Sequence, residues 1–235
     1  MSVWTRIGDL FSSATADAFS TLVEGARSLF EGDKMTRSLV SFSIAIVALS
    51  AKMAKADGVV TEDEVNAFRD IFSIPDDQAN NVARLYNLAK QDVAGYRAYA
   101  SQVAGLCGNG ATDCPLLVDV LDGLFHIAKA DGVIHEKEMG FLDKIAEIFE
   151  ISPTHYRRIK ARHISDGEND AYLQLGADPD WDNEKLKSHF RKLVHDNHPD
   201  RLIARGVPEE FVAIANERLA AINAAWETVR AERRI

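Results

Sequence analysis

One hexapeptide occurs twice in this chain of 235 residues, and the repeat constrains the fold more than any other feature. The sequence Ala-Lys-Ala-Asp-Gly-Val fills positions 54–59 and returns at positions 128–133, which is 74 residues later. The likeness continues beyond the hexapeptides, with two glutamates after each copy and a proline, Pro75 or Pro153, at the end of each unit. Because an internal repeat indicates a small structural unit that folds more than once, the sequence predicts a duplicated middle region.

The residues around each hexapeptide predict helices. Apolar residues before both copies recur at three- and four-residue steps, which is the pattern of one helix face. Gly58 and Gly132 occupy the position where a left-handed residue ends a helix. A capping box over residues 61–64 starts the next helix of the first copy, whereas His135 makes the equivalent cap of the second copy weaker. We therefore predict an all-α fold, with a helical bundle over residues 36–165.

Acidic residues in and after the two turns allow two interpretations. Asp57 and Glu64, together with Asp131 and Glu138, could offer oxygen ligands to a divalent cation or a contact to a partner. No EF-hand loop is present, however, and acidic side chains are also common in turns and helix caps. A cation or partner site and simple turn capping both stay open at this point.

Composition excludes several classes of protein. Apolar residues make up 46% of the chain, which is enough for a core and excludes a mainly disordered chain. The 36 acidic residues exceed the 27 basic ones, and this net charge of -9 disfavours nucleic acid, since Lys and Arg supply most of that affinity. Cys107 and Cys114 match no common zinc or redox spacing, so we expect two inert thiols in a reducing compartment.

The apolar spacing predicts an amphipathic helical segment over residues 1–35, without a secretory signal. Its apolar stripe could pack on the rest of the chain, bind a second copy or lie on a membrane, although membrane-surface helices usually carry more basic residues. The longest uncharged stretch, residues 38–51, is too short to cross a bilayer, which takes about 20 apolar residues. We therefore expect a cytoplasmic protein, with peripheral contact to the inner membrane as an alternative.

A polar break at residues 166–169 marks a boundary in the chain. After it, apolar spacing and end residues predict a short helix that Gly176 ends and a second helix that begins near Asp182. A third helix is predicted over residues 208–230, because a proline and two glutamates occupy its first turn. We expect the last two helices to be antiparallel, with a loop at their tip that contains His-Pro-Asp at positions 198–200.

The second of these helices carries a basic strip within an acidic chain. Lys187 and Arg191 lie four residues apart on one face, and Lys192 is beside them. Such a strip favours encounter with an acidic partner. No nucleophile or third metal ligand converges on the histidines of this region, so we do not expect an enzyme.

The C-terminal segment resembles the J domain of DnaJ-type co-chaperones. The resemblance rests on residues 171–176, 190–193, 198–201 and 222–226, which occur in order and with the family's helix spacing. Asn197 departs from the family, in which an aromatic residue is common before the motif. The resemblance implies a domain that docks on a DnaK-type chaperone and stimulates its ATPase without covalent chemistry. The residues that it implies for chaperone binding are His198, Pro199, Asp200, Lys187, Arg191, Lys192 and Arg201.

The middle region resembles the TerB-like family, known from tellurite-resistance proteins and from the N-terminal half of DjlA-type co-chaperones. The paired turns, the acidic residues after them and the all-helical pattern carry this resemblance. It implies a pseudo-symmetric bundle that acts as an interaction module, in some members with a metal ion. A TerB-like bundle followed by a J domain is the DjlA-type arrangement, although those proteins usually begin with a transmembrane segment that this sequence lacks.

Together these patterns divide the chain into an N-terminal helical segment at 1–35, a TerB-like bundle at 36–165 and a J-domain hairpin at 166–235. We expect a co-chaperone that stimulates a DnaK-type ATPase, with the bundle selecting an unidentified protein client, a partner or a location. The alternative is a stress-related binding module that acts through the bundle, with or without a divalent cation. No other cofactor is expected.

Overall fold

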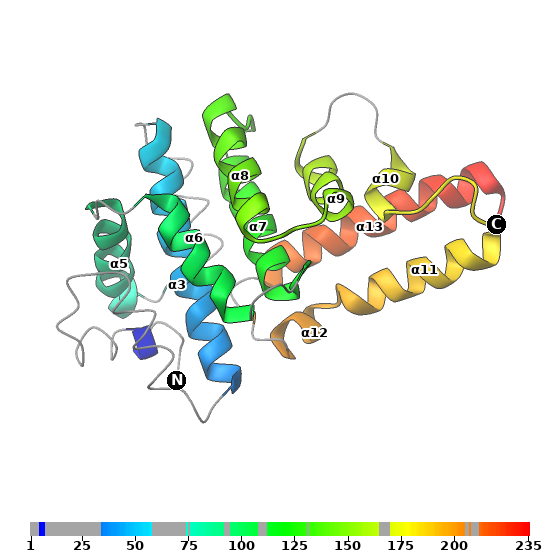
Figure 1. Cartoon of the computed structure of the whole chain (residues 1–235). Helices are drawn as coiled ribbons and strands as arrows, with labels where there is room; N and C mark the ends of the chain where they lie inside the picture. Colours follow the sequence, from blue (N-terminus) through cyan, green and yellow to red (C-terminus); the bar gives the residue numbers. More distant parts are fainter. Residues whose placement is uncertain are drawn as a thin grey trace.

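The computed structural model shows a chain built from helices. It describes residues 5–7, 34–57, 74, 76–91, 95–107, 112–130, 132–164, 170–204, 207 and 212–235. Every regular element in these ranges is a helix, which confirms the predicted all-α class. Figure 1 shows a bundle of helices from which a long helical arm extends to the C-terminus.

The bundle is assembled around α3 (Lys34–Asp57). This helix contains the longest uncharged stretch of the sequence, and its side chains from Val40 to Ala54 are buried, as expected for a helix that is apolar on all sides. Two buried serines satisfy their hydroxyls on the helix itself, since Ser43 donates to the Leu39 carbonyl and Ser50 to the Ile46 carbonyl. Among the described residues, no helix has both the length and the hydropathy needed to cross a membrane.

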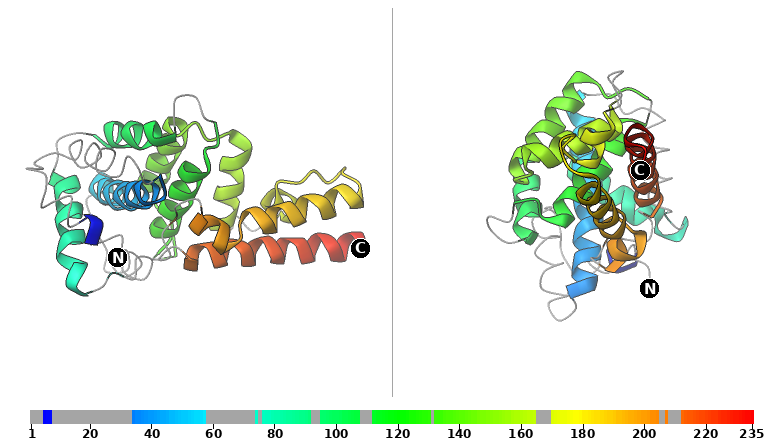
Figure 2. Two further views of the ribbon diagram at one scale, coloured as in Figure 1. Left: turned by 90° about the horizontal axis from the view of Figure 1, so that it is seen from below. Right: turned by 90° about the vertical axis from the view of Figure 1, so that its right-hand side faces the viewer.

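Among the described residues, four helices pack on α3 and form the bundle with it. Two come from the first half of the chain and two from the second, and the views in Figures 1 and 2 agree on this arrangement. They are α5 (Ala79–Gln91), α6 (Tyr96–Ala104), α7 (Pro115–Ala128) and α8 (Glu136–Ile148). Short 3-10 turns precede α5 at Asp76–Gln78 and follow α6 at Gly105–Cys107. One more helix, α9 (Pro153–His163), lies against α7 on the side of the arm.

The turn of the second repeat has the predicted form. Helix α7 ends before Gly132, which has a φ of 92°, and α8 starts after His135. Glycine suits this position because a side chain at that φ would be strained. The equivalent turn of the first repeat lies outside the described residues.

Part of the N-terminal segment reaches the bundle. Ile7 is fully buried in the bundle core, and the Arg6 guanidinium donates to the Thr36 hydroxyl over 2.9 Å. For residues 5–7 these contacts favour packing on the chain itself, one of the three alternatives for residues 1–35. The remainder of that segment before Lys34 lies outside the described residues, and membrane contact and self-association stay predictions.

The arm consists of α11 (Asn183–Asp196) and α13 (Val212–Arg233), which lie side by side and run in opposite directions (Figures 1 and 2). The short helix α10 (Ala171–Leu175) packs on α13 and ends at Gly176, as predicted, with a φ of 62°. The arm has its own small core, in which the rings of Phe190 and Trp226 stack at 4.6 Å. The buried residues of this core are Ala171, Tyr172, Leu175, Leu186, Leu193, Ile222, Ala225, Trp226 and Val229.

The His-Pro-Asp end of the arm lies against the bundle rather than at a free tip. The link between the two long helices contains an extra short helix, α12 (Pro199–Ala204). Leu202, Val207, Ile214 and Ala215 are buried in the same core as the bundle helices. The free end of the arm is therefore its other end, where the C-terminus lies (Figure 1).

The expectation of two inert thiols is wrong. Cys107 and Cys114 form a disulfide, and the chain has no free cysteine. Cys107 ends the 3-10 turn after α6 and Cys114 directly precedes α7, which brings their Cα atoms to 6.3 Å. This separation lies within the range that a disulfide spans, although the spacing of the two residues in the sequence matches no common zinc or redox motif.

Candidate functional site

The His-Pro-Asp loop is exposed to solvent. Just over half of the His198 side chain and 86% of the Asp200 side chain are accessible. Pro199 is the first residue of α12, where its missing N–H costs nothing, and Asp200 lies in the first turn. The Asp200 backbone N–H donates to His198 Nδ1 over 3.3 Å.

The predicted basic strip follows α11 toward this loop. Arg191 and Lys192 are exposed, whereas Lys187 is half-buried with its Nζ 3.6 Å from a Glu184 oxygen. Arg201, on α12, lies 3.5 Å from an oxygen of Asp196. Exposed pairs of this kind stabilise a fold only weakly, so these cations stay able to attract an acidic partner.

Asn197, directly before the motif, makes one local and one tertiary hydrogen bond that the sequence did not indicate. Its Nδ2 donates to the Leu193 carbonyl over 2.8 Å, which ends α11. Its Oδ1 accepts a hydrogen bond from Arg218 Nη1 at 3.4 Å. This polar side chain thus links the loop to α13.

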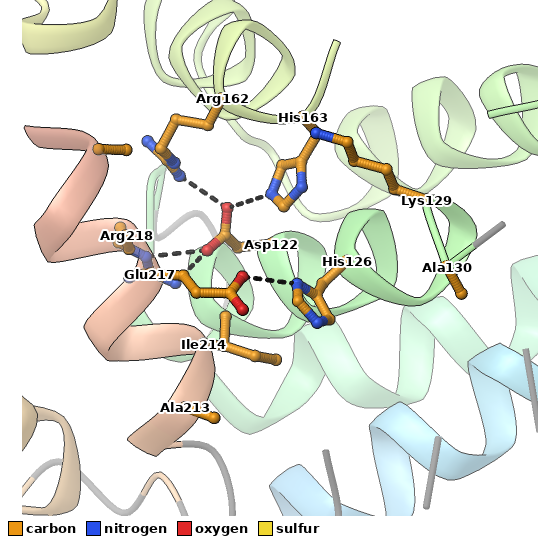
Figure 3. A pocket seen from close by; sticks show the side chains of 11 residues that line it. Asp122, His126, Lys129, Ala130, Arg162, His163, Ala213, Ile214, Glu217 and Arg218 are labelled. Atoms are coloured by element: carbon orange, nitrogen blue, oxygen red, sulfur yellow. Dashed lines mark hydrogen bonds and ion pairs between the residues drawn. The ribbon is translucent and has the colours of Figure 1, made fainter. Parts of the chain in front are cut away.

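Arg218 belongs to a buried ion cluster between the arm and the bundle. Its Nε donates to Asp122 Oδ2 over 2.8 Å, and its Nη1 donates to Asp119 Oδ1 over 2.7 Å. The other oxygen of Asp122 lies 2.7 Å from Arg162 Nη2 and 3.0 Å from His163 Nε2 (Figure 3). We call Asp119, Asp122, Arg162, His163 and Arg218 the buried ion cluster. It connects α7 and α9 of the bundle with α13 of the arm.

Burial and neighbouring charges shift the pKa values of Asp122 and Arg218 in opposite directions. Burial alone would raise the pKa of Asp122, but Arg162, Arg218 and the hydrogen bond with His163 hold that pKa well below its ordinary value. Burial would likewise lower the pKa of Arg218, and the two aspartates raise it instead. Asp122 and Arg218 therefore stay ionised at neutral pH, and their charges are compensated inside the protein.

A pocket of about 520 Å³ lies beside the cluster, between α7, α9 and α13 (Figure 3). His126 and Glu217 face each other across it, with Nδ1 and Oε2 3.2 Å apart. Burial lowers the pKa of His126, and the opposing effect of Glu217 does not restore it. The pocket is lined by Asp122, His126, Lys129, Ala130, Arg162, His163, Ala213, Ile214, Glu217, Arg218 and Ala221.

Of the four acidic residues considered for a divalent cation, the structure describes the side chain of Glu138 alone. That side chain is buried, and its Oε2 accepts the His135 backbone N–H at 2.9 Å, which is the capping role that the sequence left open beside a cation or partner site. The side chains of Asp57, Glu64 and Asp131 lie outside the described residues. Within the described ranges, no group of three or more His, Cys, Asp or Glu side chains is arranged to hold a metal ion. The cation site stays a prediction.

Sequence reasoning did not identify the buried ion cluster. The available signal was that Asp119 and Asp122 interrupt a helix whose other side chains are mostly apolar. A carboxylate in such a helix requires a buried cationic partner. The identity of that partner is not encoded locally, because Arg218 is 96 residues from Asp122 in the chain.

Comparisons with known proteins find relatives over most of the chain. The family model described as tellurite resistance protein TerB matches residues 43–161. A protein named co-chaperone protein DjlA from Aliivibrio fischeri is 27% identical over 237 residues, which covers 87% of this chain and 83% of the relative. A protein of the same name from Haemophilus ducreyi is 25% identical over 257 residues, which covers 94% of this chain and 88% of the relative. Another protein of this name, from Shewanella oneidensis, is 41% identical over 64 residues, which cover 27% of this chain and 24% of the relative. No solved structure gives a significant match.

Proposed function

The chain belongs to the TerB family, and on this basis we propose that it is a co-chaperone that stimulates the ATPase of a DnaK-type chaperone. The observation that carries the proposal is the exposed His-Pro-Asp loop at the end of a helix with a basic strip. Similarity to proteins named co-chaperone protein DjlA over more than four-fifths of both lengths supports it. The bundle would then bind a client or a partner, or determine location.

The proposed action is one of binding rather than covalent chemistry. Lys187, Arg191 and Lys192 attract an acidic surface of the chaperone and speed encounter, since charges of opposite sign steer association. The His198 ring and the Asp200 carboxylate then make directed polar contacts, and Pro199 restricts the backbone between them. These contacts promote hydrolysis only if they favour the hydrolysing state of the chaperone over its other states.

The test is single-turnover ATP hydrolysis by a purified DnaK-type chaperone from the same organism, with and without the full chain. We expect the chain to accelerate hydrolysis and His198→Gln to reduce that effect more than about tenfold, as for a central contact residue. His195→Gln is the matched control, because His195 is an exposed histidine on α11 whose ring nitrogen lies 3.3 Å from Asp196. An unmodified chain without effect, or a fully active His198→Gln variant, would refute the co-chaperone proposal.

A second candidate function is a binding module that acts through the bundle with a divalent cation. The match to the tellurite-resistance family over residues 43–161 favours it, since this match covers the bundle and not the arm. Calorimetric titration of the full chain with Ca²⁺ or Mg²⁺ tests it. Binding that His198→Gln leaves intact and Glu64→Gln weakens supports this function, and the absence of binding argues against it.

A further inference from the structure

Two tertiary anchors flank the His-Pro-Asp loop, and both lead to the bundle. Before the loop, Asn197 is hydrogen-bonded to Arg218, whose other contacts are carboxylates of α7. After the loop, Leu202 is buried in the core of the bundle. Residues 198–201 therefore span the short distance between a polar anchor and an apolar one.

The polar anchor is rigid. The Arg218 side chain is only 6% exposed, and Asp119 and Asp122 fix its guanidinium from two directions. A guanidinium is planar, so carboxylates on two of its edges determine where its remaining N–H groups point. One of these groups, on Nη1, is directed at Asn197 Oδ1. The position of Asn197 thus depends on two side chains that belong to the bundle.

We propose that the bundle positions the His-Pro-Asp loop through Arg218, so that the shape of the loop depends on Asp119 and Asp122. This inference rests on the proposed function, since the loop is taken to be the chaperone contact. Arg218 is a positioning residue, because it lies beneath the loop and acts through Asn197. The TerB-family bundle then helps to position the loop for the chaperone, in addition to any binding role of its own.

The proposal predicts a particular change in the stimulation curve. When Asn197 loses Arg218, the loop samples more conformations and the chaperone-binding shape becomes a smaller fraction of them. The concentration of this chain that gives half-maximal stimulation then rises in inverse proportion to that fraction, while stimulation at saturation stays the same. A loss of folded protein would raise the half-saturating concentration in the same way, so circular dichroism must first show the folded fraction of each variant, and the concentrations are expressed per folded chain.

The experiment compares Asn197→Ala and Arg218→Met in the full chain. Asn197→Ala leaves the contacts of Arg218 with the aspartates in place, so the bundle stays docked even if Arg218→Met unfolds. We expect the half-saturating concentration to rise roughly fivefold to tenfold in both, the change expected from one lost hydrogen bond of ordinary strength. Asn197→Ala also removes the Nδ2 hydrogen bond to the Leu193 carbonyl, which Arg218→Met keeps, so the positioning role requires the rise in both variants. The matched controls are Asn216→Ala and Arg230→Met, since both residues are exposed on α13.

Hydrogen exchange supplies a second readout that needs no chaperone. The Arg201 and Leu202 amides donate to the His198 carbonyl, and we expect them to exchange faster in Asn197→Ala than in the unmodified chain. Unchanged exchange together with an unchanged half-saturating concentration would overturn the positioning role. If the unmodified chain does not stimulate any chaperone, the proposed function fails, and exchange still decides whether Arg218 restrains the loop.

Discussion

Asp122 is a carboxylate in a largely apolar helix, and its burial is possible because three side chains pair with it. Arg162, His163 and Arg218 all lie within 3.0 Å of its oxygens. A buried carboxylate without such partners would be strongly destabilising, whereas a fully paired one is tolerated. The cluster is consequently sensitive to the removal of any single member.

We expect Asp122→Asn to destabilise the protein by about 3–5 kcal/mol, the usual cost of breaking a buried ion pair by removing one partner. The amide has nearly the shape of the carboxylate but leaves Arg162 and Arg218 without their shared charge. Urea unfolding followed by circular dichroism measures the change. Glu147→Gln is the control, because Glu147 is an exposed carboxylate that pairs with Lys144 at 2.9 Å, and its loss should cost less than about 1 kcal/mol.

The difference in unfolding free energy between Asp122→Asn and the unmodified chain should depend on pH, and this dependence identifies its electrostatic origin. The pKa of Asp122 is held well below its ordinary value, so its contribution is complete above the unfolded pKa, which is about 3.9, and is lost as the pH falls through the lower folded pKa. The stability of Asp122→Asn should therefore approach that of the unmodified chain as the pH falls below 4. A gap that is the same at pH 7 and at the lowest pH at which both proteins fold would contradict this assignment.

The cluster also marks the limit of prediction from sequence at this scale. The capping role of Glu138 was one of two interpretations open in the sequence, since it depends on a residue three positions away. The pairing of Asp122 with Arg218 depends on how two distant helices pack, and no local spacing records it. For Asn197 the sequence indicates only a departure from a family pattern, and its partner Arg218 is brought to it by the fold.

Helices with strong local signals were predicted well. Asp182 caps α11 by accepting the Lys185 N–H at 2.7 Å, and Gly176 ends α10 in the left-handed conformation. Helix α12 was not predicted, because six residues are too few to form a stable helix alone. It is stabilised by contact, since Leu202 inserts into the bundle core. Helices that are stabilised by packing rather than by their own residues cannot be predicted from local sequence patterns.

The disulfide that joins the 3-10 turn after α6 to α7 gives a prediction at the scale of elements. Closing a loop of this length should stabilise the fold by about 2.5 kcal/mol through the entropy of the unfolded chain. We expect reductant to lower the urea midpoint of the unmodified chain. The Cys107→Ser/Cys114→Ser double variant should unfold at that lower midpoint, and reductant should not change it further. Two titratable thiols in the native, unreduced protein would show that the bond is absent.

At the scale of the molecule, the described residues form two apolar cores, and the C-terminal region contributes to both. The arm has its own small core, which includes Leu186, Trp226 and Val229. The end near the His-Pro-Asp loop shares the core of the bundle. The boundary predicted near residue 165 thus separates two regions of sequence, while residues beyond it complete the packing of the first region.

A fragment of residues 166–235 tests the consequence of this shared core. Leu202, Val207 and Ile214 would become exposed, and each loses about 1.5–3 kcal/mol of burial free energy. Their sum is comparable with the whole stability of a small domain, about 5 kcal/mol at the low end. Arg218 would also lose both of its aspartates. We therefore expect the fragment to unfold at lower urea than the full chain and to stimulate the chaperone only at higher concentration.

The Arg218→Met substitution, made in the fragment as well as in the full chain, shows why the fragment stimulates the chaperone only at higher concentration. Arg218→Met impairs the full chain because it removes the polar anchor, but the fragment lacks the partners of that anchor already. The same substitution should consequently change the half-saturating concentration of the fragment by less than about twofold, since effects on one shared interaction are not additive. Circular dichroism shows whether the fragment is helical under the assay conditions. A fragment as stable and as active as the full chain would mean that the arm forms the loop without the bundle, and that the buried ion cluster only fastens the two parts together.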